Sequence, residues 1–240
     1  MATPPPAPSP DLVLALLADA RLPVGGHTQS GGLEPALVHG GLTSADVPAF
    51  LRGRLATVVA VEAGTAVVAR HRALTAGALG SAPGEEASGE AVFGDVEEAW
   101  AARTASAPLR EASRTLGRGY LRLAQRLWPG SAVLDALGRR PPRPLVLGAV
   151  AALAGLDAAR LVRLCGHEDA ATLGAAALKL DPLDPAETVV WTLAAHPLVE
   201  ELVPRLVGLT DPAEIPAGSA PLVEEHSLRH ARTTHRLFQA

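Results

Sequence analysis

Leu-Pro-Val-Gly-Gly-His-Thr-Gln-Ser-Gly-Gly-Leu-Glu occupies residues 22–34 and separates two apolar segments with helical spacing. Pro23 blocks continuation of the preceding helix, because its ring fixes φ at about −65° and its nitrogen carries no hydrogen. The glycines at 25, 26, 31 and 32 let the backbone adopt positive φ or approach another segment closely. This segment, called the glycine loop below, therefore predicts a shaped backbone within a helical chain. An ordinary connection between two helices is the alternative.

The composition indicates closely packed helices. Hydrophobic residues make up 48% of the chain and aromatic residues only 3%, so Ala, Leu and Val must fill the core. No segment alternates apolar and polar side chains as a strand would. We predict an all-α, single-domain bundle of about ten helices over residues 11–240, with mobile N- and C-terminal segments. Residues 1–10 contain five prolines and are expected to form a disordered tail.

Helical spacing and capping residues locate individual helices. Thr43 or Ser44 is expected to begin a long helix that runs toward Leu74, and Asp95 to begin another. Asp184 followed by Pro185 is a strong start signal. The remaining helices are predicted over residues 11–20, 33–38, 108–128, 145–154, 158–165, 167–180 and 222–238. In the helix over 108–128, the expected core-facing stripe is Leu109, Ala112, Leu116, Tyr120, Leu123 and Leu127.

Charge and cysteine content exclude several classes of protein. The net charge of −4 means that the chain lacks the excess of positive charge that is typical of proteins that bind nucleic acid. Cys165 is the only cysteine, which excludes an intrachain disulfide and favours a cytoplasmic location. The longest apolar run, residues 145–156, is shorter than the ~20 residues that span a bilayer, and Asp11 argues against an export signal. We therefore expect a soluble protein without nucleic-acid or membrane partners.

No catalytic motif or cofactor site is predicted. Gly26 and Gly31 have P-loop spacing, but Gly32 takes the position of the essential lysine, and Lys179 is the only lysine in the chain. Ser30 lies near His27 and Glu34 in sequence, which does not establish the geometry of a triad. Cys165 and His167 are two residues apart on an expected helix and so face different directions.

The C-terminal histidines are the only metal candidate. His226 and His230 are four residues apart on an expected helix, and His235 follows. A helical His-Glu-x-x-His motif is absent, because Ser227 follows His226. A transient nickel contact is one interpretation, a solvated helix that faces a partner is another, and a metal-dependent hydrolase is the corresponding alternative function.

Leu-Pro-Val-Gly-Gly-x-x-x-Ser-x-Gly-Leu-Glu resembles the signature loop of the UreF urease accessory proteins. His27 and Gln29 depart from the family, which usually has an aromatic residue and a tyrosine there, and Asp184 replaces a usual glycine. The resemblance extends from about Leu12 to Phe238 through further segments at 109–112, 116–118, 144–148, 175–183, 227–230 and 236–238.

This resemblance implies a non-enzymatic, helical homodimer. Such a protein bridges the scaffold UreD (also called UreH) and the GTPase UreG on apo-urease and helps to insert nickel into the urease active site. A generic helical adaptor is the third alternative. The residues expected to bind partners are Gly25, Gly26, Gln29, Ser30, Gly32, Glu34, Lys179, His230, Arg236, Leu237 and Phe238.

Two of these expectations can be stated in structural terms. Gly26 is expected at positive φ, where a β-branched side chain would be strained. Arg236 beside Leu237 and Phe238 has the composition of an interface anchor. In such an anchor, two exposed apolar side chains bind the partner and an adjacent arginine guanidinium makes charged hydrogen bonds. The alternative is a tail whose Phe238 folds back onto its own domain.

Overall fold

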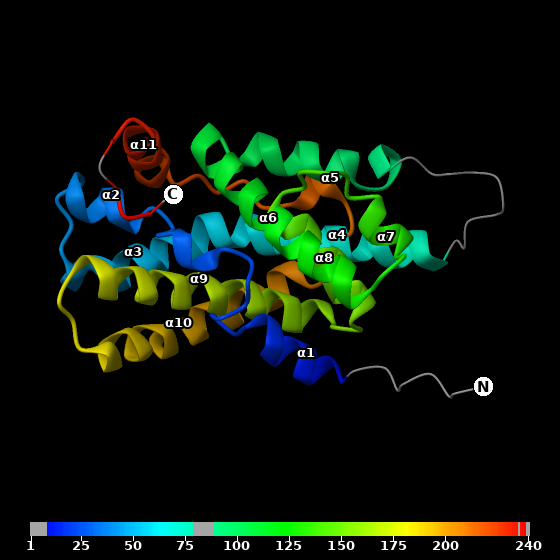
Figure 1. Cartoon of the computed structure of the whole chain (residues 1–240), viewed down its shortest axis with the longest axis horizontal. Coiled ribbons are helices and arrows are strands. Elements are labelled where there is room, and N and C mark those ends of the chain that lie inside the picture. The colour runs from blue at the N-terminus through cyan, green and yellow to red at the C-terminus, as the bar shows by residue number, and fades with distance from the viewer. Residues whose placement is uncertain (1–8, 79–88, 235, 239–240) are drawn as a thin grey trace.

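Helices form all the regular secondary structure of residues 9–78, 89–234 and 236–238, which are the residues described by this computed structural model (Figure 1). No strand occurs among them, so the all-α prediction is confirmed. The expected tail falls mostly on residues 1–8, outside the described residues. The α-helices are α1 (Pro10–Leu17), α2 (Leu33–Val38), α3 (Val47–Arg54), α4 (Ala60–Ala78), α5 (Gly89–Arg103), α6 (Ala107–Leu127), α7 (Ala132–Asp135), α8 (Arg143–Leu153), α9 (Ala158–Leu180), α10 (Pro185–Leu206) and α11 (Pro221–His230). Short 3₁₀ turns are η1 (Gly26–Thr28), η2 (Ser44–Asp46) and η4 (Pro212–Glu214), and the π segment η3 (Leu55–Val59) joins α3 to α4.

Helix α4 lies at the centre of the core because small side chains let its neighbours approach. Ala63, Ala66 and Ala69 are fully buried. A Cβ atom at Gly148 of α8 would lie 2.4 Å from the carbonyl oxygen of Ala66, so only glycine allows α8 to pack so closely there. Helices α5 and α9 also pack against α4, and α6 packs across α8. No helix of the described ranges is long and apolar enough to cross a membrane.

Helices α9 and α10 form an antiparallel pair along one side of the molecule (Figure 1). The sequence predicts two helices in place of α9, with a break near Gly166, and this is wrong. A Cβ atom at Gly166 would lie 2.5 Å from Cγ2 of Val199, so the glycine brings α10 close to α9 instead of ending the helix. The predicted start of α10 is confirmed, since the Asp184 carboxylate accepts the N–H of Ala186 at 2.9 Å.

Two predictions for α5 and α6 require correction. Asp95 lies inside α5, which begins at Gly89, and its carboxylate accepts a hydrogen bond from Arg72 of α4 at 2.7 Å. The predicted stripe of α6 is not its buried face, apart from Tyr120. The buried residues are Ser113, Gly117, Tyr120, Leu121 and Ala124, whereas Leu109, Ala112, Leu116 and Leu123 are half-buried and Leu127 is exposed.

The C-terminal segment lies at one end of the molecule, beside α2 and α11 (Figure 1). Helix α11 ends at His230, eight residues before the predicted end of the last helix. The chain then turns back, so that Phe238 joins a small apolar cluster separate from the main core. The buried members of this cluster are Leu33, Val47, Ala176, Ala177 and Phe238.

Candidate partner-binding site at the glycine loop

Three glycines give the glycine loop its shape. Gly25, Gly31 and Gly32 have φ values of 91°, 61° and 84°, in the left-handed region that favours glycine. Gly26 is not among the positive-φ residues, so the expectation for Gly26 is wrong. It begins η1, whose turn is held by the hydroxyl of Thr28 donating to the Gly25 carbonyl oxygen at 2.8 Å. The loop is therefore a defined backbone structure rather than a simple connection.

Arg54 and Lys179 attach the loop to the helices around it. The buried Arg54 guanidinium donates to the Gly31 carbonyl oxygen at 2.6 Å and pairs with both carboxylate oxygens of Asp169 at 3.0 and 2.5 Å. The Lys179 ammonium donates to the carbonyl oxygen of His27 at 3.1 Å. Lys179 was a predicted site residue, and the structure places it beside the loop although 152 positions separate it from His27. The sequence analysis did not identify Arg54 and Asp169 as site residues.

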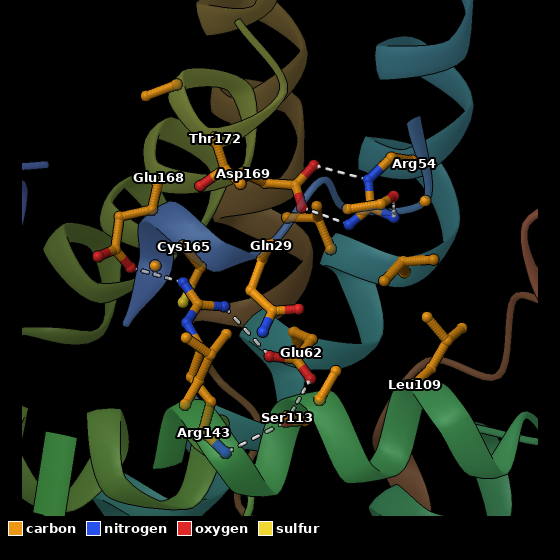
Figure 2. A pocket seen from close by; sticks show the side chains of 18 of the residues that line it. Gln29, Arg54, Glu62, Leu109, Ser113, Arg143, Cys165, Glu168, Asp169 and Thr172 are labelled. Atoms are coloured by element: carbon orange, nitrogen blue, oxygen red, sulfur yellow. Dashed lines mark hydrogen bonds and ion pairs between the residues drawn. The ribbon is translucent and has the colours of Figure 1, made fainter. Parts of the chain in front are cut away.

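A buried ionic cluster lies behind the loop, and sequence reasoning missed it as well. The Arg143 guanidinium donates to Glu62 at 3.2 Å and to Glu168 at 2.5 Å (Figure 2). The Tyr120 hydroxyl donates to the other oxygen of Glu168 at 2.5 Å, and the Ser113 hydroxyl donates to Glu62 at 3.3 Å. Glu62 was the available signal, because it is the only charged residue in the apolar helical segment 55–69 and such a charge is rarely buried unless it is paired.

The pKa shifts in this cluster favour a fixed structure over acid–base chemistry. Burial alone would lower the pKa of Arg143, but the carboxylates of Glu168 and Glu62 outweigh it and raise this pKa well above its usual value. Burial, followed by the charge of Glu168, raises the pKa of Tyr120. Burial also raises the pKa of the Cys165 thiol to about 12, which leaves it protonated and a poor nucleophile at neutral pH.

A cavity of about 370 Å³ separates the loop from α6. Figure 2 shows Gln29 reaching into it above Glu62 and Arg143, with Leu109 on the α6 side. Leu109, Ala112 and Leu116 line this cavity, which explains why half of the predicted α6 stripe is not packed in the core. Glu62, Glu168 and Asp169, which line this cavity, are already paired with Arg143 and Arg54, so these carboxylates hold the structure together.

Glu34 holds the C-terminal segment against the loop. Its buried carboxylate accepts the backbone N–H groups of Leu237 at 2.7 Å and Phe238 at 3.0 Å. The His230 ring lies beside them, with Nε2 3.4 Å from Glu34 and 3.2 Å from the Phe238 carbonyl oxygen. The Lys179 ammonium lies 5.0 Å from the centre of the Phe238 ring. Predicted residues from the loop, α9 and the C-terminus therefore meet at one place.

Phe238 is 3% exposed, so the expectation of an exposed Leu-Phe pair is wrong for this residue, and the alternative in which it folds back is confirmed. Leu237 is 69% exposed, and Arg236 is exposed beside it. Among the other predicted residues, Gln29, Ser30, Gly32, Glu34 and His230 are buried, Lys179 is exposed, and Gly25 and Gly26 are half-buried. Of the predicted site residues, Lys179, Arg236 and Leu237 are therefore the exposed ones.

The C-terminal histidines do not form a ready metal site. His230 is directed at Glu34 and Phe238, whereas the His226 ring stands against Gly40, where an added Cβ atom would lie 2.6 Å from its Cε1. His235 lies outside the described residues. Within the described ranges, no group of three His, Cys, Asp or Glu residues is placed to hold a metal ion.

Comparison with known proteins gives consistent matches. The model of the UreF family matches residues 42–196, well over half of the chain. A urease accessory protein UreF from Mycobacterium tuberculosis H37Rv is 36% identical over 232 residues, which cover 94% of this chain and 97% of the relative. The proteins of the same name from Mycobacterium sp. strain JLS and Mycobacterium marinum are 34% and 32% identical, again over 94% of this chain and 96% and 97% of theirs.

Proposed function

Because the chain belongs to the UreF family of urease accessory proteins, we propose that it acts in the maturation of urease without catalysing a reaction itself. The observation that carries this proposal is the similarity to named UreF proteins over almost the whole chain. We further propose that the protein bridges the scaffold UreD (UreH) and the GTPase UreG on apo-urease in the cytoplasm. It thereby helps to insert nickel into the urease active site.

The surface around the glycine loop supports a role in binding. Lys179 is exposed and its ammonium lies over the Phe238 ring, and the exposed residues Arg236 and Leu237 immediately precede Phe238 in the chain. Glu34 and Arg54 fix the backbone of the C-terminal segment and of the glycine loop beneath this surface. A preorganised surface with apolar and arginine contacts is typical of an interface anchor.

The test is to express the urease subunits, UreD and UreG of the same organism with and without this protein. We expect active, nickel-containing urease only when the protein is present, and we expect it to co-purify with UreD and, through UreD, with UreG. Urease activity and the nickel content of purified urease are the two measurements. Full activation in its absence, or no co-purification with either protein, would contradict the proposal.

An exposed apolar face of α10 supports self-association. Val189, Val190 and Leu193 are 67%, 62% and 66% exposed, and their spacing puts them on one face of the helix. We propose that this face forms the homodimer. Leu193→Asp should give a monomer with unchanged helical content by light scattering and circular dichroism. Leu12→Asp on α1, where the leucine is 71% exposed, is the matched control and should remain dimeric.

A further inference from the structure

Two histidines meet on the seam between α9 and α10, away from the glycine loop. Nδ1 of His167 lies 3.4 Å from Nε2 of His196, with ring centres 5.7 Å apart and ring planes tilted by 50°. The close approach depends on Gly166, which lets Val199 of α10 touch the α9 backbone. Both rings are half-buried, so solvent and ions reach the seam.

A carboxylate lies one helical turn from this pair. Glu200 follows His196 by four residues on α10, so the two share a face of the helix. Its carboxylate now accepts two hydrogen bonds from Arg163 of α9, at 2.6 and 2.8 Å. Both side chains of this ion pair are about half exposed, at 46% and 53%. Since exposed ion pairs contribute little to stability, Glu200 can turn toward the histidines at small cost.

The distance between the ring nitrogens fits a metal ion. Two imidazole nitrogens that bind one tetrahedral zinc ion at about 2.0–2.1 Å lie roughly 3.3–3.4 Å apart. One ring now donates to the other. For metal binding, the proton of the donor ring moves, by exchange with water, to that ring's other nitrogen, and a tilt of each ring then directs both lone pairs at a common point. Each histidine binds a metal ion in its neutral form.

We propose that His167, His196 and Glu200 form a binding site for a tetrahedral divalent metal ion, zinc or cobalt in preference to nickel, with water as the fourth ligand. Two histidines and one glutamate are an established ligand set for zinc, whereas nickel with nitrogen and oxygen ligands prefers square-planar or octahedral geometry. The three side chains are not yet gathered, as no preformed three-residue group occurs among the described residues. The site therefore assembles when Glu200 leaves Arg163. It does not depend on the proposed role in urease maturation.

The experiment uses the full-length chain without a histidine tag. Titration with Co²⁺ should give one equivalent of bound metal with the intense visible absorption of tetrahedral cobalt, and Zn²⁺ should displace it. His167→Gln and His196→Gln should each weaken binding by about 100-fold, and Glu200→Gln by about tenfold. Arg163→Gln should strengthen binding by roughly two- to tenfold, because it frees Glu200. A histidine pair that only stabilises the helices would not produce this opposite effect.

Two control variants test the location of the site. His71→Gln on α4 removes an exposed histidine elsewhere, and His226→Gln removes the alternative metal candidate; both should bind Co²⁺ as the unmodified chain does. Circular dichroism of each variant verifies that it is folded. Three outcomes would overturn the proposal: no tetrahedral cobalt spectrum in the unmodified chain, retained binding in the His167→Gln, His196→Gln double variant, or weaker binding in Arg163→Gln.

Discussion

At the residue scale, the four glycines of the loop are not equivalent. Gly25, Gly31 and Gly32 have positive φ and Gly26 does not. Gly32 has φ of 84°, and a Cβ atom there would lie 3.3 Å from Cγ1 of Val223. Gly26 lies outside the positive-φ set, and a Cβ atom there would meet nothing within 4 Å. The sequence cannot distinguish the two, because both are glycines in the same kind of local pattern.

This difference predicts unequal effects of the same substitution. Gly32→Ala should lower the free energy of unfolding by about 1–3 kcal/mol, because alanine is strained at positive φ. Gly26→Ala should change it by no more than about 0.5 kcal/mol. Urea denaturation of both variants measures the effect, and urease activation should fall in the first variant only. Equal stability of the two variants would show that the loop relaxes without strain.

Glu34 is the residue that joins the loop to the C-terminus, because one carboxylate accepts two backbone N–H groups there. Glu34→Gln replaces one acceptor oxygen by a donor, so at least one of these bonds must be lost. We expect the segment around 236–238 to exchange amide hydrogens faster, with a loss of about 1–3 kcal/mol of local stability. Hydrogen exchange with mass spectrometry measures this directly.

Glu225→Gln is the matched control for Glu34→Gln. It removes a carboxylate of α11 that pairs with Arg229 at the surface, where both side chains are more than half exposed. Such a pair contributes little, so exchange in the C-terminal segment should be unchanged. If Glu34→Gln also left exchange unchanged, the segment would be held by Phe238 alone.

At the scale of the element, helix starts depend on single side chains. Asp157 precedes α9, and its carboxylate accepts the N–H of Arg160 at 2.7 Å. This backbone bond is the main reason that the pKa of Asp157 is lowered, with the Arg160 side chain adding to the effect. Asp157→Ala should therefore destabilise the protein at neutral pH by about 1 kcal/mol, the typical contribution of an N-cap.

The pH dependence of this effect has a definite sign. The pKa of Asp157 is lower in the folded chain than the value of about 3.9 expected for the unfolded chain. Its contribution is therefore fully present above about pH 4 and is lost as the pH falls through the folded pKa. Denaturation curves of the original chain and Asp157→Ala should differ at pH 7 and pH 5 and converge below pH 4. A constant difference across this range would show that the charge of Asp157 has no role.

Local signals predicted the helices well, and long-range contacts explain the failures. Asp184 with Pro185 is a local signal, and α10 begins there as predicted. Gly166 does not break α9, because a residue of another helix, Val199, fills the space beside it. The Arg143 cluster joins residues that lie 81 and 25 positions apart. No sequence pattern specifies such pairing. The glycine loop could therefore be predicted from the sequence, but the Arg143 cluster behind it could not.

At the scale of the whole molecule, the fold brings the glycine loop, the end of α9 and the C-terminus to one surface. Lys179 contacts both the loop and Phe238, so it connects these segments although they lie at opposite ends of the sequence. Adjacent residues of the C-terminus then have opposite roles. Phe238 is buried in an apolar cluster, and Leu237 beside it is 69% exposed. Single substitutions at Phe238 and Leu237 can therefore separate the stability of the fold from the partner binding that we propose.

Phe238→Ala should weaken the fold of this end of the molecule by about 3 kcal/mol, since a buried phenylalanine is removed from the cluster with Leu33 and Ala177. Leu237→Ala should leave the melting temperature unchanged, because its side chain lies mainly in solvent. If the exposed anchor binds a partner, Leu237→Ala and Arg236→Ala should nevertheless reduce co-purification with UreD, each by roughly 1–3 kcal/mol of binding free energy. Thermal unfolding and quantitative co-purification, applied to all three variants, test both halves of this prediction. Wild-type assembly by the Arg236→Ala, Leu237→Ala double variant would mean that the C-terminus only stabilises the fold and that partners bind another face.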